Sequence, residues 1–478
     1  MPSLSSGRLD RLDSFDRLDS FGRLGRLDPL GRLRCCGRRR RFASVAGLAV
    51  LLLFVAGCGS ATPTVSPPAT PTAATPASPP SSAATSAAPS GPVSGAPSGS
   101  PAVDVDAIYS AIEAQVIDIR GLKPTRPVDR QFIDESQLRT LITQQFDEET
   151  PPAYLAANER LYKALGLIPV DAKLRDLTLD LLSGGVAGFY RNDQGKLYVV
   201  SRTGTPGAIE RFTFSHEYDH ALQDQNYTVF KDQQGVRDQS DRLLARQAVY
   251  EGDATLVMTQ WAAKALTQQD LLELIALSTD PKNAALLARM PPILRETLAY
   301  PYTTGFAYVQ RAQSSGGWAA VNQLYGRMPE STEQILHPEK YAASEAPIKV
   351  TFPADLATRL GKGWTVSLED TFGELQLGIW LAAGSPATAA STAAAAGWGG
   401  DRLAVMEGPN GRWAVVMHTV WDTEQDAIDF ETAANLALHK ADGISGIAPG
   451  AGGKHRWIVV ASDGATFRTV QNVLGLAS

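Results

Sequence analysis

One short stretch, His-Glu-Tyr-Asp-His at residues 216–220, constrains this chain more than any other part of its sequence. On a helix, side chains four residues apart project from the same face, so one metal ion can bridge His216 and His220. The intervening Glu217 then lies where it can accept a proton from a water molecule bound to the ion. We therefore expect residues 208–224 to form a helix that carries two zinc ligands and a general base.

The first 57 residues differ in composition from the rest of the 478-residue chain. Residues 1–34 repeat Arg-Leu-Asp and Gly-Arg-Leu units without a core-forming pattern, which indicates a disordered leader or a start codon assigned too far upstream. Four arginines at 38–41 precede an apolar run, 42–56, and this order is typical of a secretory signal. An uncleaved membrane anchor is the alternative, although about 15 apolar residues are few for a spanning helix.

The apolar run ends in Val-Ala-Gly followed by Cys58, and small residues directly before a cysteine resemble the lipobox of bacterial lipoproteins. The resemblance implies that residues 1–57 are removed and that Cys58 becomes a lipidated N-terminus. The rest of the chain is then anchored to the cell membrane on its extracytoplasmic face. Loss of Cys35 and Cys36 leaves no pair of cysteines for a disulfide, so ordinary cores must stabilise the fold.

Charge and composition limit the partners of the chain. Residues 1–57 contain 11 Arg and 5 Asp, so the part from Cys58 onward has 33 basic and 45 acidic residues and a net charge of −12. This charge argues against nucleic acid or anionic lipid as a partner. Residues 58–102 are almost entirely Ala, Thr, Pro, Ser and Gly without any charge, so we expect an extended, disordered tether.

Hydrophobic spacing predicts two folded domains after the tether, 103–345 and 346–478. In the first, residues 105–180 carry apolar side chains at helical spacing, and 188–200 predicts a β-hairpin around Asn-Asp-Gln-Gly. A long helix is expected from about 240 to 266. The predicted class is α+β, with a mainly helical domain that contains a small sheet, followed by a smaller α+β domain.

The second domain is expected to follow the order α-β-β-α-β-α and to be of roughly ferredoxin-like size. The predicted elements are a helix at 367–382, strands at 402–407 and 412–420, a helix at 424–440, a strand at 456–461 and a helix at 465–474. No convergent set of reactive side chains is visible in this domain. Two of its three histidines, His418 and His439, do not indicate a site, and His337 in the preceding loop is expected to be structural.

A zinc site that activates water needs three protein ligands and one open position. The three-histidine metzincin pattern would need Gly at position 223 and His at position 226, but the chain has Gln223 and Asn226, which excludes that class. The long helix offers Glu251 within a stripe of apolar residues. Burying a carboxylate is costly unless it is paired or binds metal, so Glu251 is the expected third ligand, with an ion pair to Arg246 as the alternative.

Two longer phrases carry a resemblance to a known family. His-Glu-x-x-His at 216–220, followed on a later helix by Glu-Gly-Asp-Ala-Thr at 251–255, resembles the gluzincin metallopeptidases. The phrases at 214–225 and 331–340 are similar to those of exported bacterial and archaeal lipoproteins with peptidase-like domains. The resemblance covers residues 105–345 and implies a zincin-like fold whose hairpin edge strand binds an extended peptide or protein substrate.

By this resemblance, His216, His220 and Glu251 would bind one Zn²⁺ ion, and Glu217 would be the general base in the hydrolysis of a peptide bond. The ion would polarise the scissile carbonyl and lower the pKa of its water towards ~7. The chain would then be a membrane-anchored, extracytoplasmic zinc metalloendopeptidase.

The sequence departs from the family at one position. Thermolysin-like enzymes carry an Asp four residues after the ligand glutamate, where this chain has Thr255. Asp253 is the candidate substitute that orients the imidazoles, and Tyr302, with Tyr300 and Tyr308, is a candidate to stabilise the oxyanion. Two alternatives stay open. The chain could be a binding or scaffold lipoprotein that keeps the fold and zinc without proteolysis, or a metal-free solute-binding lipoprotein, which would leave Glu251 and both histidines unexplained.

Overall fold

The structure is a computed structural model, and it describes most of the chain after the predicted tether. The described residues are 104–182, 188–200, 204–236, 239–384 and 388–476. The predicted leader, Cys58 and the tether 58–102 lie outside these ranges. Within them, no helix combines the length and the apolar character that crossing a membrane requires.

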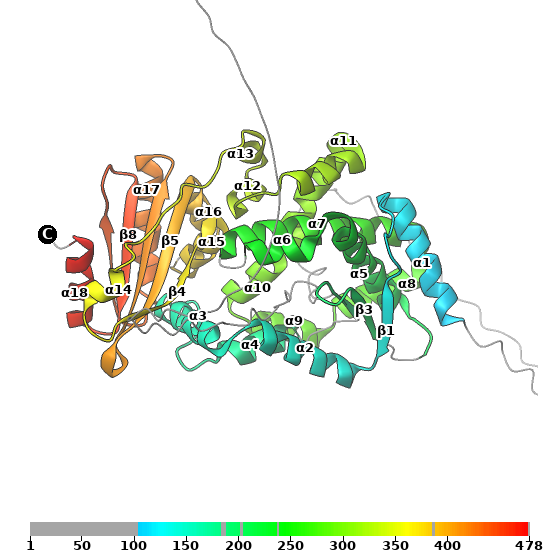
Figure 1. The fold of residues 1–478 in the computed structure, drawn as a ribbon, viewed down its shortest axis with the longest axis horizontal. Helices are drawn as coiled ribbons and strands as arrows, with labels where there is room; N and C mark the ends of the chain where they lie inside the picture. The colour runs from blue at the N-terminus through cyan, green and yellow to red at the C-terminus, as the bar shows by residue number, and fades with distance from the viewer. Residues whose placement is uncertain (1–103, 183–187, 201–203, 237–238, 385–387, 477–478) are drawn as a thin grey trace, which may run out of the picture. The chain divides into compact units, whose positions relative to one another are not determined.

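The predicted fold class is confirmed: a mainly helical region with a three-stranded sheet precedes an α+β region with a five-stranded antiparallel sheet (Figure 1). The elements of the helical region are α1 (Val105–Arg120), β1 (Asp129–Ile133), α2 (Glu135–Glu149), α3 (Pro152–Ala164), α4 (Leu174–Leu182), β2 (Gly188–Arg191), β3 (Lys196–Val200), α5 (Ala208–Tyr227), α6 (Val229–Gly235), α7 (Ser240–Ala265), α8 (Gln268–Ser278), α9 (Pro281–Arg289), α10 (Pro292–Tyr300), η2 (Pro301–Gly305), α11 (Phe306–Gly326), α12 (Thr332–Leu336) and α13 (Pro338–Ala342).

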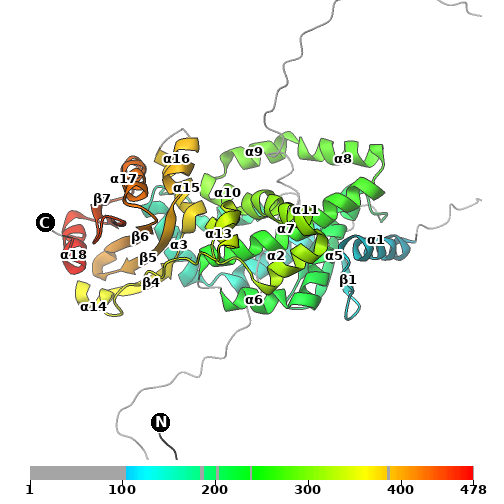
Figure 2. The same ribbon diagram turned by 90° about the horizontal axis from the view of Figure 1, so that it is seen from above.

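The C-terminal region has helices on both faces of its sheet (Figure 2). Its elements are α14 (Leu356–Leu360), β4 (Thr365–Asp370), α15 (Gly373–Gly384), α16 (Thr388–Ala395), β5 (Trp398–Glu407), η3 (Pro409–Gly411), β6 (Trp413–Trp421), α17 (Glu424–Leu438), β7 (Ile444–Pro449), β8 (His455–Ala461) and α18 (Gly464–Leu474). Alternate residues of the central strands face opposite layers, as a strand requires. Val415 packs with α15 and α17, whereas Val416 packs with α14 and α18.

The sheet of the helical region has the order β1-β3-β2, so β3 is central and β2 forms one edge. The hairpin of β2 and β3 is confirmed, and β1, which the sequence did not predict, adds to β3 in parallel. The outer side of β2 faces α5, because the backbone N–H of Tyr190 donates to a carboxylate of that helix. This edge therefore lies beside the 216–220 motif.

Two predictions for the C-terminal region were wrong in detail. Residues 365–370, partly assigned to a helix, form β4, because Leu368 and Asp370 alternate towards the interior and pair with β5. The following helix begins only at Gly373, whose φ of 69° is a left-handed value that favours glycine. The strand β7 was missed because it contains Gly446 and Pro449, and it lies at the edge of the order β4-β5-β6-β8-β7, where such residues are tolerated.

The two regions share a hydrophobic core. Buried residues of α3, including Leu161, pack with buried residues of the C-terminal region such as Trp380 and Trp421. The indole N–H of Trp380 also donates to the backbone carbonyl of Leu165, at 3.2 Å. The C-terminal region is thus packed against the part of the chain that carries the motif.

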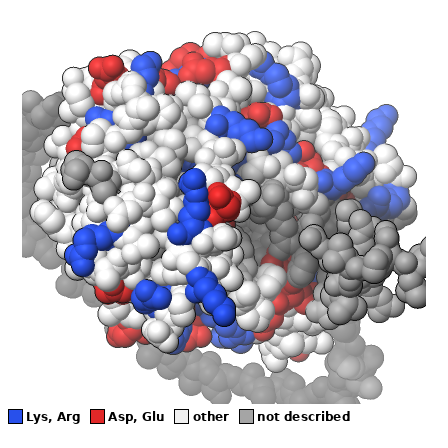
Figure 3. All heavy atoms as spheres, turned by 60° about the vertical axis from the view of Figure 1, so that its left-hand side comes forward, with Lys and Arg blue, Asp and Glu red and all other residues white. Residues whose placement is uncertain are grey.

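Charged side chains of both signs are interspersed on the face drawn in Figure 3, and wide areas between them carry no charge. A face that binds nucleic acid presents clustered Lys and Arg side chains instead. On the face drawn in Figure 3, Lys and Arg side chains are separated by uncharged areas and by Asp and Glu side chains.

Candidate metal site

Two buried helices bring the predicted ligands together. The helix α5 is enclosed by α1, α7 and the small sheet, and α7 crosses it with Glu251 facing the motif. The Nε2 atoms of His216 and His220 lie 3.0 Å apart, and each is 3.1 Å from Oε2 of Glu251. The three side chains form a possible metal-binding group. His216 and Glu251 are buried, and the side chain of His220 is 11% exposed.

The donor set and its spacing fit a zinc ion. Two imidazoles and one carboxylate form a common ligand set of catalytic zinc. Bonds of about 2.0–2.1 Å in a tetrahedral site place neighbouring ligand atoms roughly 3.3 Å apart, so the three atoms need to separate by only a few tenths of an ångström. The predicted alternative, an ion pair of Arg246 with Glu251, does not form, because Arg246 bonds to Asp232.

The electrostatics of the three side chains favour a positive charge where their donor atoms meet. Burial alone raises the pKa of Glu251, but the charge of His220 and hydrogen bonds from both histidines lower it to about 2. Burial lowers the pKa of His220, yet the Glu251 carboxylate outweighs this effect and raises it to about 10. Burial and the charge of His220 lower the pKa of His216 to about 4. One positive charge is therefore stabilised beside Glu251.

Gln223 orients one of the imidazoles, a role that the sequence did not predict. Its amide nitrogen donates to Asp219 Oδ2 at 2.8 Å and to the backbone carbonyl of Tyr250 at 3.0 Å. Its oxygen must therefore accept, and it lies 3.1 Å from Nδ1 of His220. This arrangement keeps a ring proton on Nδ1, so that Nε2 faces the metal-binding group and offers its lone pair to an ion once its own proton is released. The spacing of three residues between His220 and Gln223 on one helix was the available signal.

Glu217 lies between the metal-binding group and the edge strand. Its Oε2 accepts the backbone N–H of Tyr190 in β2 at 2.8 Å, and its Oε1 has no hydrogen-bond partner among the described residues. The side chain is fully buried. Burial raises the pKa of Glu217 to about 8, and the nearby Glu251 contributes to this shift. Once ionised, the side chain has one free oxygen that can accept a proton, and a pKa close to neutrality suits a group that takes up and then releases that proton.

Asp253 contacts neither imidazole among the described hydrogen bonds. Its Oδ1 lies 2.9 Å from Nε of Arg120 on α1, and its Oδ2 accepts the hydroxyl of Tyr325 on α11 at 2.6 Å. Both partners of the ion pair are fully buried. The carboxylate of Asp253 raises the pKa of Asp219, whose value of about 7 results mainly from burial. Asp253, which belongs to α7, thus joins this helix to α1 and α11.

Of the three candidate tyrosines, Tyr302 lies beside the metal-binding group. It belongs to the π-helical turn η2, and its ring centroid is 6.1 Å from that of His216. The turn approaches α7 closely, because a Cβ at Gly252 would lie 2.4 Å from the carbonyl oxygen of Gly305. The hydroxyl of Tyr300 instead donates to the Thr332 carbonyl at 3.1 Å. Tyr308 packs against Tyr341.

A largely apolar cavity of about 270 Å³ opens next to these residues. Glu251 and Tyr302 both line it, and the rest of its wall comes mainly from α4, α7 and α10. Leu181, Leu294 and Leu298 are among its apolar lining residues. A cavity of this size accommodates one amino-acid side chain.

The histidines outside the motif have other partners. Nε2 of His337 lies 2.9 Å from Oε1 of Glu374 in the C-terminal region. Nε2 of His418 lies 2.9 Å from Nδ1 of His455, and its ring stacks on Trp457. Each of these contacts joins two segments that are distant in the sequence.

Comparison with known proteins yields one match, and it lies outside the metal-binding group. Residues 363–472 match a family model described as Domain of unknown function (DUF8575). No curated protein and no solved structure matches the chain. The matched residues include most of the C-terminal region, from β4 to α18.

Proposed function

We propose that this chain is an extracytoplasmic zinc-dependent peptidase, anchored to the cell membrane by a lipid on Cys58, which hydrolyses peptide bonds with Glu217 as the general base. The observation that carries the proposal is the position of Glu217 between two other features. On one side lie the donor atoms of His216, His220 and Glu251, and on the other lies the edge of β2.

The residues of the site have distinct roles in this proposal. Zinc, when bound, supplies Lewis acidity and lowers the pKa of a coordinated water towards ~7. Glu217 accepts the proton of the attacking water through Oε1 and passes it to the leaving amine, while the Tyr190 N–H holds Oε2 in place. Gln223 keeps the Nε2 lone pair of His220 directed at the ion.

The substrate is proposed to be a peptide or protein rather than a nucleic acid. An extended peptide binds to an edge strand through backbone hydrogen bonds, which supply affinity without strong sequence preference. The apolar cavity beside Glu251 would receive one side chain of that peptide. Tyr302, whose ring lies close to His216, is the candidate donor to the oxyanion.

A second candidate function is a zinc-binding scaffold lipoprotein without proteolysis. It is favoured by the burial of the site, because Glu217 and His216 are fully enclosed and β2 is buried along its whole length. A substrate segment that reached Glu217 would have to displace some of this packing. The same fold and the same zinc ligands would serve a scaffold equally well.

Two measurements test these proposals. Zinc content, measured by mass spectrometry of the metal, is expected to be one ion per wild-type chain and to fall well below one in Glu251→Ala. Hydrolysis of casein that stops on addition of a zinc chelator supports the peptidase. Full zinc occupancy without hydrolysis supports the scaffold, and wild-type protein without zinc overturns both.

A further inference from the structure

The helix that presents Glu251 receives its N-terminal cap from the C-terminal region. The backbone N–H of Ser240, the first residue of α7, donates to Oδ1 of Asp370 at 2.9 Å, and its hydroxyl donates to Oδ2. The preceding residue, Gln239, makes no capping hydrogen bond with its side chain. A carboxylate at this end satisfies an otherwise free N–H and interacts favourably with the helix dipole.

The second residue of α7 is held by the same interface. Oδ1 of Asp241 accepts the backbone N–H of Thr332 at 3.1 Å and its hydroxyl at 2.6 Å. The hydroxyl oxygen of Thr332 in turn accepts the N–H of Leu375 in α15, at 3.2 Å. Gly373 lies directly against Asp241, because a Cβ there would be 1.7 Å from Oδ1. The start of α7 is therefore enclosed by α12 and by the start of α15.

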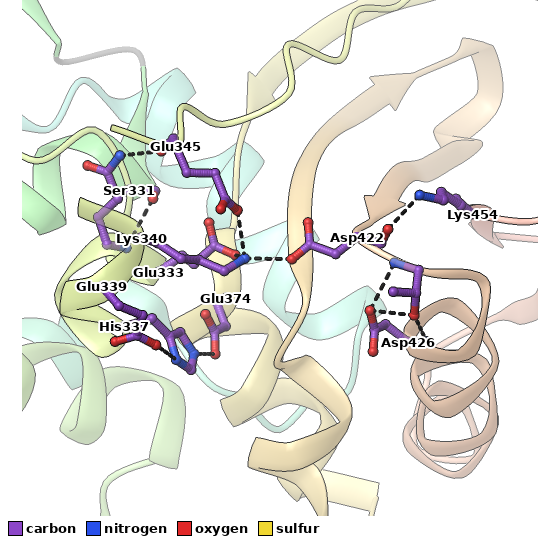
Figure 4. A network of polar contacts seen from close by, with 12 residues as sticks. Ser331, Glu333, His337, Glu339, Lys340, Glu345, Glu374, Asp422, Asp426 and Lys454 are labelled. Carbon is purple, nitrogen blue, oxygen red and sulfur yellow. Dashed lines mark hydrogen bonds and ion pairs between the residues drawn. The ribbon is translucent and has the colours of Figure 1, made fainter. Parts of the chain in front are cut away.

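The segment 331–340 was noted in the sequence but is not part of the metal-binding group. Its side chains contact the C-terminal region beside the start of α7 (Figure 4). Nζ of Lys340 lies 2.6 Å from Glu333 Oε1, 2.9 Å from Glu345 Oε1 and 2.6 Å from Asp422 Oδ2 of the C-terminal region. Oxygens of these three carboxylates lie close enough together to hold a cation, and the ammonium group of Lys340 contacts all three. The bond of His337 to Glu374 adds a second connection.

We propose that the C-terminal domain positions α7, and through it Glu251, with Asp370 as the positioning residue and the Lys340 cluster holding the interface together. This inference rests on the proposed zinc site and assigns a role to the domain that matches the family of unknown function. The 12 residues from Ser240 to Glu251 span roughly 16 Å of continuous helix. Beyond Glu251, the close contact of Gly252 with Gly305 leaves α7 little room to adjust independently.

Variants of β4 in the full-length chain test this inference. Asp370→Ala removes the cap, Asp370→Asn keeps its shape without the charge, and Asp370→Glu restores the charge. Glu369→Ala is the matched control, because Glu369 is the neighbouring residue and pairs with Arg402 rather than with α7. Two readouts are needed: the zinc affinity from competition with a chelator, and hydrogen exchange of amides 240–243 in metal-free protein.

We expect Asp370→Ala to speed exchange of these amides and to weaken zinc binding roughly threefold to tenfold, the scale of a lost helix cap. Asp370→Asn should also speed amide exchange and weaken zinc binding, but by less than Asp370→Ala. It provides the same test if the alanine variant does not fold. Asp370→Glu should recover most of the loss, and Glu369→Ala should match the wild type.

Unchanged zinc affinity in the folded Asp370 variants overturns the inference, and so does unchanged exchange of amides 240–243. If the wild type binds no zinc, the proposed function is overturned instead. Faster exchange in Asp370→Ala then still supports the positioning of α7 by the C-terminal domain. The two proposals therefore fail separately.

Discussion

The side-chain oxygen of Gln223 lies 3.1 Å from Nδ1 of His220, one helical turn away on α5. The amide nitrogen of Gln223 is fixed by Asp219 and by the backbone of Tyr250 on α7. The contact therefore ties the orientation of one imidazole to the helix that carries Glu251. Gln223 also occupies the position where the three-histidine metzincin pattern has glycine. The residue that excludes the metzincin class therefore orients His220 in the group of His216, His220 and Glu251.

Replacing Gln223 with leucine should weaken zinc binding without removing any ligand. The leucine cannot accept the Nδ1 proton, so the ring of His220 loses its fixed tautomer, and loss of such a partner typically costs 10–100-fold in metal affinity. Competition with a chelator measures the change. Gln225→Leu is the control, because Gln225 lies on the same helix but accepts backbone N–H groups of residues 125 and 126. Equal affinity of both variants would show that Gln223 does not orient the ring.

Replacing Glu217 with glutamine should separate zinc binding from catalysis. The amide oxygen can still accept the Tyr190 N–H, so the local packing is retained, but the side chain no longer accepts a proton. We expect full zinc content and a fall in casein hydrolysis of at least roughly 10²-fold. Glu424→Gln, at an exposed position in the first turn of α17, is the control. Hydrolysis that survives in Glu217→Gln would remove Glu217 from the mechanism.

Replacing Arg120 with methionine should destabilise the fold. Arg120 and Asp253 form a fully buried ion pair, and removal of one partner leaves a buried charge uncompensated. The expected loss is about 3–5 kcal/mol in the free energy of unfolding, measured with urea. Zinc affinity of the folded fraction should change less than in Gln223→Leu, because no described hydrogen bond joins Asp253 to either imidazole. A larger loss of affinity would instead support the prediction that Asp253 orients the ligands.

The parts of the site that the sequence predicted are those with local signals. The four-residue spacing of His216 and His220 specifies one face of a helix wherever the helix lies in the fold. Glu251 was identified because a carboxylate in an apolar stripe needs a partner. The hairpin was predicted from a turn ending in Gly195, whose φ of 66° is a left-handed value.

The parts that the sequence did not predict depend on residues that are far apart along the chain. The partner of Asp253 is Arg120, 133 positions away, and the cap of α7 is Asp370, 130 positions from Ser240. Neither pair leaves a periodic pattern in the sequence. The strand β1 was missed for a related reason, since it is short and at an edge, and its parallel pairing with β3 is set by the surrounding packing.

The pairing of His418 with His455 predicts a pH dependence of stability. Burial and the charge of His455 lower the pKa of His418 from 6.5 to about 4. Between pH 6.5 and pH 4 the unfolded chain therefore binds a proton that the folded chain does not. The contribution of His418 to the free energy of unfolding should be complete above pH 6.5 and should decline as the pH falls through this window.

Urea unfolding at a series of pH values measures this decline. His418→Phe keeps an aromatic ring against Trp457, whose centroid lies 4.0 Å from that of His418, but cannot bind a proton. Between pH 6.5 and 4 the free energy of unfolding of this variant should fall less steeply than that of the wild type, because unfolding no longer adds a proton at position 418. Some decline should remain, because other groups still titrate. His439→Phe, at the exposed end of α17, should keep the wild-type slope. A slope in His418→Phe equal to that of the wild type would show that the proton enters the folded protein at His418 without cost.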